Sequence, residues 1–283
     1  FRRILWRTYR FAKHFLLFPL IQVQYWYLNM ISTPTTLESR QKKELLGLTI
    51  EEELGKWGFD VFAPFNTRWY NESVQDSVKI AEFSNICHDG SLGFLIGNSK
   101  EAWPYFIAFV QKHGVSDNPF DDFTKYVVNA AIKKCCDTFK EIQRIPKVYW
   151  VCDMEPGKLI HALKLAEVAG VAYFDKDVHL CIHPRFGPWF GLRAAIVFDL
   201  PGPIPEERPE PVPCPLSSNE REKAQQQMEA AVEANSRLPK TENYKYWVNL
   251  RDSLTPHHPS RYSEDQIYYH YTKDVQFLQK IIS

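Results

Sequence analysis

The chain has 283 residues, of which 45% are hydrophobic and 24% charged, and its 34 basic and 34 acidic side chains leave no net charge. This composition excludes a collagen, a coiled-coil rod and a disordered polar tail, and the neutral balance disfavours a nucleic-acid partner. The 19 Phe, 14 Tyr and 8 Trp exceed what a core needs when aliphatic residues are available, and they are the first functional indication.

The N-terminal segment has an unusual charge pattern. Residues 1–37 contain no Asp or Glu but several Arg and Lys, which is typical of transit peptides. The apolar run Phe15–Val23 is broken by Pro19 and is far shorter than the roughly 20 residues that a membrane span needs. We therefore expect no stable membrane span, treat residues 1–35 as a leader-like appendage or a segment absent from the mature chain, and expect a cytoplasmic protein.

The first half of the chain predicts two helices and two strands. Thr49-Ile50-Glu51-Glu52 has the spacing of a capping box and predicts a helix that begins there and runs toward Gly58. Residues 60–65 and 92–97 have strand patterns. Asn98 is the predicted N-cap of a helix that Gly114 ends.

A longer helix follows, and then most of the predicted sheet. Asn118-Pro119 predicts the start of an amphipathic helix that runs to about residue 142. Residues 147–152 read as a strand that ends at Asp153, and residues 157–167 as a helix. Three closely spaced strands are predicted at 171–174, 178–183 and 189–199, and the last is apolar enough to be the central strand.

The C-terminal third is separated from this core by proline. Seven of the fifteen residues from Pro201 to Pro215 are Pro, which predicts an extended strap. Helices are predicted from Ser217 to about Ala234 and from Ser263 onward. The predicted organisation is an α+β core at 36–200, a strap at 201–216, and C-terminal helices at 217–283 that complete a pocket.

The cysteines indicate a reduced chain. The six cysteines, at 87, 135, 136, 152, 181 and 214, have neither zinc-site spacing nor the density of a disulfide scaffold. Vicinal Cys135 and Cys136 fall in a helical pattern, where neighbouring side chains point about 100° apart and do not easily bridge.

Common catalytic motifs are absent from the sequence, so the candidate site consists of isolated groups. There is no dinucleotide fingerprint, Walker loop, nucleophile elbow or zinc-protease motif. Arg193 interrupts an apolar strand, so it either neutralises an internal carboxylate or awaits an anionic ligand. Arg251-Asp252 and Arg261-Tyr262 flank a loop around Thr255-Pro256, either as solvated ion pairs or as a carboxylate clamp.

Two further segments leave alternatives open. Cys181-Ile182-His183-Pro184-Arg185-Phe186-Gly187 is either a metal site or, as we favour, a turn with a structural histidine. Asp153 is either a site carboxylate or a helix cap. The aromatic pairs beginning at Trp69, Tyr173, Trp189 and Tyr268 either converge on one flat ligand or pack in the core.

Several of these motifs together resemble a known family. Trp69-Tyr70-Asn71-Glu72 and the Cys181–Gly187 block stand in order with the motifs at 58–61, 168–173, 189–190, 193 and 261–264. Over about residues 40 to 275 the chain resembles the cobalamin C trafficking proteins. The resemblance implies an α+β fold of the flavin-reductase or nitroreductase type, with a mostly antiparallel central sheet flanked by helices.

The resemblance also implies an activity on vitamin B12. Alkylcobalamins would lose their upper axial ligand to the thiolate of glutathione, and cyanocobalamin would be decyanated with electrons from reduced FAD or FMN, supplied by a flavin-dependent reductase. The implied partners are cobalamin, glutathione, that reductase and the cobalamin D protein. No metal ligands are expected, because the corrin holds the cobalt.

Site residues follow from the resemblance position by position. Arg193 and Arg251 would bind and position glutathione. The residues implied to contact cobalamin are Asp153, Ile160, His161, Ala162, Leu163, Tyr173, Phe174, Asp175, Cys181, Leu192 and Tyr262, and Tyr70 and Trp189 are expected near the corrin ring.

Two departures from the family pattern keep other functions open. Glu167 replaces a common His, and a third glutathione-side Arg is replaced near Phe277, with Lys273 or Lys280 as possible substitutes. The alternatives to the enzyme are a cobalamin chaperone without catalysis and a flavin-dependent nitroreductase.

Overall fold

The computed structural model describes residues 34–83, 89–140 and 142–282. The chain divides into two compact units, Phe1–Leu48 and Thr49–Ser283, and helix α3 (Pro34–Gly55) crosses the boundary. The leader-like residues, the apolar run Phe15–Val23 and Cys87 lie outside the described residues. In the described ranges, no helix has both the length and the apolar character needed to cross a membrane.

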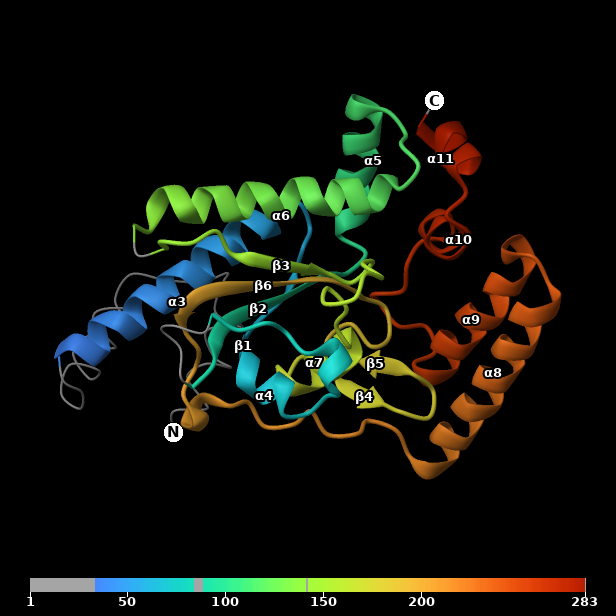
Figure 1. The fold of residues 1–283 in the computed structure, drawn as a ribbon. Coiled ribbons are helices and arrows are strands. Elements are labelled where there is room, and N and C mark those ends of the chain that lie inside the picture. The colour runs from blue at the N-terminus through green and yellow to red at the C-terminus, as the bar shows by residue number, and fades with distance from the viewer. Residues whose placement is uncertain (1–33, 84–88, 141, 283) are drawn as a thin grey trace, which may run out of the picture. The chain divides into compact units, whose positions relative to one another are not determined.

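The second unit is built on an antiparallel sheet of four strands in the order β1-β2-β6-β3 (Figure 1). These strands are β1 (Val61–Asn66), β2 (Ser91–Asn98), β3 (Lys147–Trp150) and β6 (Gly191–Pro201). The four matching sequence predictions are confirmed to within two residues. The expected central position of the last strand is also confirmed, since β6 pairs with β2 on one side and β3 on the other.

Side chains alternate across this sheet and bury both of its faces. On one face, Phe65, Leu95 and Val197 join an apolar cluster with α4 (Thr67–Asn71) and α7 (Ala162–Val168). On the other face, Phe94 stacks on Phe62 with ring centres 5.0 Å apart. Figure 1 shows α6 (Pro119–Thr138) along that second side, near α5 (Ala102–His113). Each large side chain buried here contributes about 1.5–3 kcal/mol.

The strands predicted at 171–174 and 178–183 do not belong to the central sheet, which is a correction. They are short strands, β4 (Tyr173–Asp175) and β5 (Leu180–Ile182), and they form a separate hairpin. The carboxylate of Asp175 accepts hydrogen bonds from the backbone N–H groups of Asp177 and Val178, which closes the turn between them. Because β2 and β3 occupy both edges of β6, no position beside the long strand remains for them.

Three helix starts also differ from the predictions. Asn98 caps no helix, because it is the last residue of β2 and its amide binds Arg193, whereas α5 begins at Ala102. Thr49 lies inside α3 rather than at its start. The helix predicted at 157–167 begins only at Ala162, where the His161 imidazole accepts a hydrogen bond from the N–H of Lys164.

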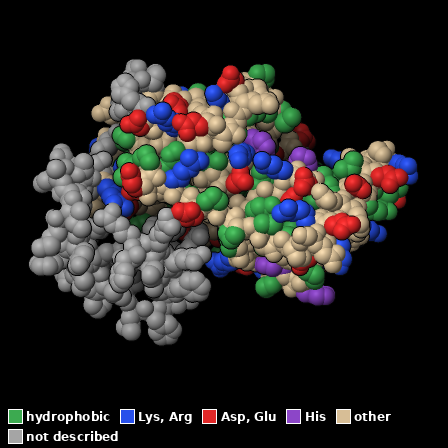
Figure 2. Space-filling view, turned by 90° about the horizontal axis from the view of Figure 1, so that it is seen from below, with side chains coloured by type: hydrophobic (Ala, Val, Ile, Leu, Met, Phe, Trp, Pro, Cys, Tyr) green, Lys and Arg blue, Asp and Glu red, His purple; other side chains and the backbone are tan. Residues whose placement is uncertain are grey.

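Beyond the strap, which contains one short turn, η2 (Pro205–Glu207), the C-terminal part is helical. The helices are α8 (Ser218–Arg237), α9 (Lys240–Leu254), α10 (Glu264–Thr272) and α11 (Val275–Ile282). The predicted caps are confirmed, since Ser217 forms a capping box with Glu220 and Ser263 accepts a bond from the N–H of Gln266. Figure 2 shows basic and acidic side chains interspersed on the described part of one face, consistent with the neutral sequence.

Candidate functional site

Arg193 is held on the central strand by contacts that leave its charge unneutralised. Its Nε donates to Oδ1 of Asn98 at 2.6 Å, and its guanidinium carbon lies 4.4 Å from the centre of the Phe120 ring. Among the described residues, no carboxylate forms an ion pair with it. Burial lowers the pKa of Arg193, but a guanidinium keeps its proton near neutral pH. Of the two alternatives for this residue, the structure therefore favours the one that awaits an anionic ligand.

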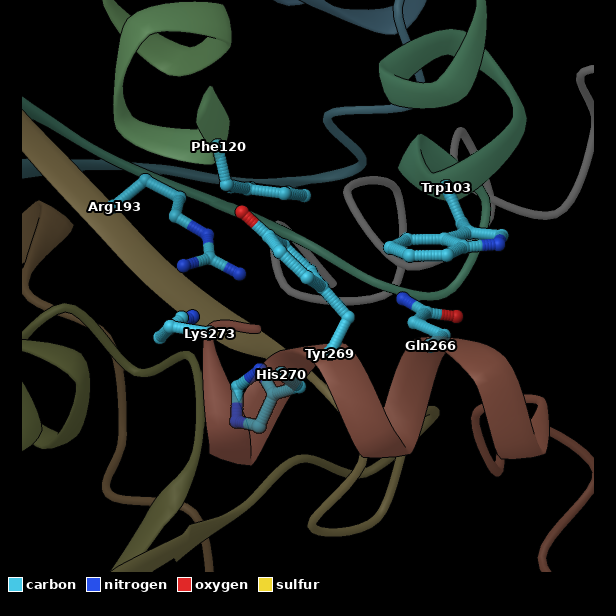
Figure 3. Close-up of a pocket in the computed structure, with 7 residues that line it drawn as sticks. All are labelled: Trp103, Phe120, Arg193, Gln266, Tyr269, His270 and Lys273. Atoms are coloured by element: carbon cyan, nitrogen blue, oxygen red, sulfur yellow. The ribbon is translucent and has the colours of Figure 1, made fainter. Parts of the chain in front are cut away.

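A small pocket opens beside this guanidinium. Figure 3 shows Arg193, Lys273 and His270 gathered at one end, and Trp103 and Gln266 at the other. The complete lining is Trp103, Phe120, Arg193, Gln266, Tyr269, His270 and Lys273, which includes no carboxylate. The free space in this pocket is far too small for a corrin ring, and its lining offers positive charge to an anionic group.

The charged end of the pocket is positive. Burial and the nearby Arg193 lower the pKa of Lys273 to about 8. Burial and the surrounding cations Arg251, Lys273 and Arg193 lower the pKa of His270 well below its ordinary value, so this imidazole is neutral at pH 7. At neutral pH the site thus presents fixed positive charges beside a neutral imidazole.

Arg251 lies in helix α9, which corrects the sequence-based placement in a loop. Its Nη1 donates to the carbonyl oxygen of Pro188 at 2.9 Å, and its guanidinium carbon lies 5.4 Å from the Trp189 ring and 5.7 Å from the Tyr271 ring. These contacts use little of its donor capacity, because a guanidinium carries five N–H groups.

Arg261 behaves differently from Arg251. Its Nε lies 3.0 Å from Oδ1 of Asp252, and its Nη1 lies 2.6 Å from Oε1 of Glu264. The ion-pair alternative is therefore confirmed for Arg261, and of these three arginines Arg193 and Arg251 form no ion pair with a carboxylate of the described residues.

Tyr262 lies with the arginines, although the resemblance assigns it to cobalamin. Its ring packs on Trp189 with centres 5.4 Å apart, and burial raises the pKa of its hydroxyl. Within the described ranges, that buried hydroxyl has no hydrogen-bond partner. A buried donor without a partner is costly, so this hydroxyl is a candidate contact for a bound group.

Part of the set implied to bind cobalamin consists of partly exposed apolar side chains that border one core cluster, and we call these residues the apolar edge. Ile160, Leu163 and Leu192 are half-buried and pack against the cluster beneath α4 and α7. His161 is exposed, and its backbone N–H donates to the Tyr70 hydroxyl at 2.7 Å. This edge offers the partly exposed apolar surface that a flat macrocycle needs.

The other implied residues already have partners inside the protein. Asp175 is buried, and its Oδ2 lies 3.5 Å from Nε of Arg221. Cys181 donates to the Leu163 carbonyl oxygen at 3.5 Å, and burial raises the pKa of its thiol to about 12, so it is no thiolate nucleophile at pH 7. Phe174 and Ala162 are also buried.

Asp153 is not the cap of a helix. Its backbone N–H bonds to the Trp150 carbonyl oxygen, and α7 begins nine residues later at Ala162. The half-buried carboxylate stands at the end of β3, where the site alternative places it.

The Cys181–Gly187 block forms the turn that we favoured. Nδ1 of His183 accepts bonds from the N–H groups of Arg185 and Phe186, and His183 pairs with Gly187 across the turn. The described residues contain no metal-binding group of His, Cys, Asp or Glu side chains. The aromatic pairs pack in the core rather than around one pocket, since Tyr70 and Phe174 are buried in one core cluster and Trp189 is buried in another.

Sequence reasoning missed Trp103, Phe120, Gln266 and His270. Nothing local identifies them, because the first turns of α5 and α6 meet α10 only in the folded protein. Lys273 was named from the sequence as a possible substitute for the third arginine, and in the structure it has a left-handed backbone with φ 55° at the end of α10. That conformation ends the helix beside the pocket.

Two relatives with assigned activities are similar to most of this chain. The human cyanocobalamin reductase / alkylcobalamin dealkylase is 28% identical over 265 residues, which cover 87% of this chain and 81% of that protein. The mouse protein of the same name is 26% identical over 273 residues, which cover 87% of this chain and 82% of that protein.

A solved structure shares the fold. It is that of a B12-trafficking protein CblC from C. elegans, a human MMACHC homologue, with a TM-score of 0.63 and 18% identity over 86% of this chain and 96% of that one. The methylmalonic aciduria and homocystinuria type C family matches residues 58–281, and this chain belongs to that family.

Proposed function

We propose that this chain binds cobalamins and removes their upper axial ligand, as the names of its relatives state for those proteins. The observation that carries the proposal is the pair Arg193 and Arg251, two guanidinium groups that lack a carboxylate partner in the described part of the chain. Such groups bind carboxylates through paired, charge-assisted hydrogen bonds.

For alkylcobalamins we propose glutathione as the acceptor. Arg193 and Arg251 hold its carboxylates, and their positive charges favour ionisation of its thiol. The thiolate sulfur attacks the alkyl carbon, and a carbon–sulfur bond forms as the cobalt–carbon bond breaks. The electron pair of the broken bond stays on cobalt, so the products are a thioether and cob(I)alamin.

The structure favours Lys273 over Lys280 as the substitute for the third family arginine. Lys273 lines the pocket with Arg193, whereas Lys280 of α11 does not. The pKa of Lys273, about 8, leaves it mainly protonated at pH 7. It is therefore part of the proposed glutathione site.

For cobalamin we propose the apolar edge formed by Ile160, Leu163 and Leu192. Its half-buried aliphatic side chains suit the face of a corrin, and we assign the half-buried Asp153 to the same site on the resemblance. Cys181 contributes packing rather than nucleophilic chemistry, because its buried thiol stays protonated.

The remaining parts of the proposal rest on the resemblance. Cyanocobalamin is decyanated with electrons from reduced FAD or FMN that a partner reductase supplies. The product passes to the cobalamin D protein in the cytoplasm. The antiparallel sheet is compatible with the nitroreductase-type fold that we propose.

An anaerobic absorption experiment tests the function. Purified protein with methylcobalamin and glutathione should develop the spectrum of a demethylated corrin, and cyanocobalamin with a reduced flavin and its reductase should lose cyanide. Cobalamin binding without either change would instead identify a non-catalytic chaperone. No spectral response to any cobalamin would refute the proposal.

A further inference from the structure

Cys214 belongs to a cluster of polar side chains outside the proposed pocket. It stands between Pro213 and Pro215 in the strap, and it is exposed. Its sulfur lies 3.1 Å from Nη2 of Arg221, in the first turns of α8. The same nitrogen lies 3.1 Å from the hydroxyl of Tyr173.

The cluster is anchored in the protein core. Nε of Arg221 lies 3.5 Å from Oδ2 of Asp175, which is buried and fixed by the turn of the β4–β5 hairpin. The Tyr173 hydroxyl lies 3.4 Å from that same oxygen. We call Asp175, Tyr173, Arg221 and Cys214 the strap thiol cluster. Within this cluster, Cys214 is the one residue that is both nucleophilic and exposed.

The chemistry of this cluster favours a thiolate. A guanidinium can only donate hydrogen bonds, so the sulfur beside Arg221 acts as acceptor, which stabilises its ionised form. Desolvation opposes ionisation of Cys214. Hydrogen bonds with Tyr173, the Leu216 backbone and Arg221 outweigh this effect, so the pKa of Cys214 is lowered. As a neutral thiol, Cys214 donates to the Leu216 carbonyl oxygen at 3.6 Å instead.

The other described cysteines have the opposite character. Desolvation raises the pKa of Cys135, Cys136, Cys152 and Cys181. Cys152 is also exposed, so exposure alone does not distinguish Cys214. The lowered pKa of Cys214 comes from the neighbouring guanidinium of Arg221 and phenol of Tyr173.

We infer that Cys214 is a thiol-modification site for small disulfides, with Arg221 as the residue that stabilises its thiolate. In the exchange, the thiolate sulfur attacks one sulfur of glutathione disulfide. A new sulfur–sulfur bond joins Cys214 to a glutathionyl group, and the second glutathione leaves as a thiolate with the electron pair of the broken bond. This site is separate from the proposed upper-ligand chemistry and does not depend on it.

Modification would also change the environment of β4. A mixed disulfide removes the negative charge that faces Arg221, and the same guanidinium contacts Tyr173 and Asp175. Both residues belong to the set that the resemblance implies for cobalamin. Modification of Cys214 would therefore reach β4 through Arg221.

Site-resolved alkylation tests the inference, with Cys152 as the internal control. The native full-length protein is treated with iodoacetamide from pH 6 to 10, and each cysteine peptide is quantified by mass spectrometry. Cys214 should reach half-maximal reactivity at a lower pH than Cys152. Below both pKa values it should react about threefold faster for each unit of separation, because tenfold more thiolate is offset by its lower nucleophilicity. Equal pH midpoints and rates would overturn the inference.

Variants separate the role of Arg221 from general effects on the fold. Arg221→Gln should move the midpoint of Cys214 upward and leave that of Cys152 unchanged, while Arg221→Lys should restore part of the shift. An unchanged Cys214 midpoint in folded Arg221→Gln contradicts the role of Arg221. If the variant does not fold, the wild-type comparison decides alone.

A direct exchange assay completes the test. Incubation with glutathione disulfide should add one glutathionyl group to the wild type, located on the Cys214 peptide, and Cys214→Ser should lose this product. Addition mainly at Cys152, or equally at all exposed thiols, would overturn the assignment.

Discussion

At the residue scale, the sequence left two alternatives for each arginine, an ion pair inside the protein or a contact with a ligand. The structure decides between them by showing which groups each arginine contacts. Arg261 binds two carboxylates, whereas the side-chain contacts of Arg193 with described residues are an amide oxygen and an aromatic face. The sequence allowed both outcomes for both residues, because the partner of a guanidinium is set by the fold and not by its neighbours in the chain.

Arg193→Gln should selectively impair the glutathione-dependent reaction. Loss of charged hydrogen bonds costs about 2 kcal/mol, which corresponds to roughly a 30-fold decrease in kcat/KM for glutathione. Methylcobalamin binding, measured by its absorption change, should remain near the wild-type value. A parallel loss of cobalamin binding would show that Arg193 supports the fold instead.

Lys273 should make glutathione binding depend on pH. Its pKa in the free protein is about 8 and a bound carboxylate raises it, so its contribution is complete below pH 8 and is lost as the pH rises further. The affinity for S-methylglutathione, which has no titrating thiol, should therefore fall between about pH 8 and 9.5 in calorimetry.

Conservative and distant variants provide the controls for Lys273. In Lys273→Arg the affinity for S-methylglutathione should change less with pH, since a guanidinium stays charged. Lys273→Gln should bind it weakly at every pH. Lys280→Gln changes an exposed position of α11, and its affinity should depend on pH as that of the wild type does. A wild-type profile in Lys273→Gln would exclude Lys273 from the site.

At the element scale, local signals located most strands and several helices. Alternation predicted β1, runs of apolar and aromatic residues predicted the other three strands of the central sheet, and Ser217 and Ser263 marked helix starts. Helix α9 was missed because Pro239 provides no side-chain cap and the sequence is mostly polar. Leu250 and Leu254 instead hold it in a cluster with Ala224 of α8, a contact between distant positions.

The close packing of β2 gives a prediction for Gly93. A Cβ there would lie 2.2 Å from the Phe65 ring, so Gly93→Ala should lower the free energy of unfolding by about 1–3 kcal/mol in urea denaturation. Gly55→Ala is the matched control, since a Cβ at this end of α3 meets no atom within 4 Å. Equal stability of the two variants would contradict the packing argument.

At the scale of the whole molecule, a ligand that binds the folded state should stabilise it. Hydroxocobalamin at 100 times its Kd adds about 2.7 kcal/mol, which is roughly a 5 °C rise in Tm for a protein of this size. Differential scanning calorimetry with increasing ligand measures this. A Tm independent of ligand concentration would show that cobalamin does not bind the native state.

The sequence by itself determined the α+β class, the strands of the sheet, the capped helices and the family resemblance. These features depend on short-range periodicity, on caps and on motifs that are contiguous in the chain. Only the tertiary structure decided that Arg193 of β6, Lys273 after α10 and Phe120 of α6 share one pocket, while Arg251 of α9 lies on Trp189. It also decided that Cys214 meets Arg221 and that Asp175 serves the hairpin. These contacts join residues through the packing of separate elements, and no local pattern records which elements will meet.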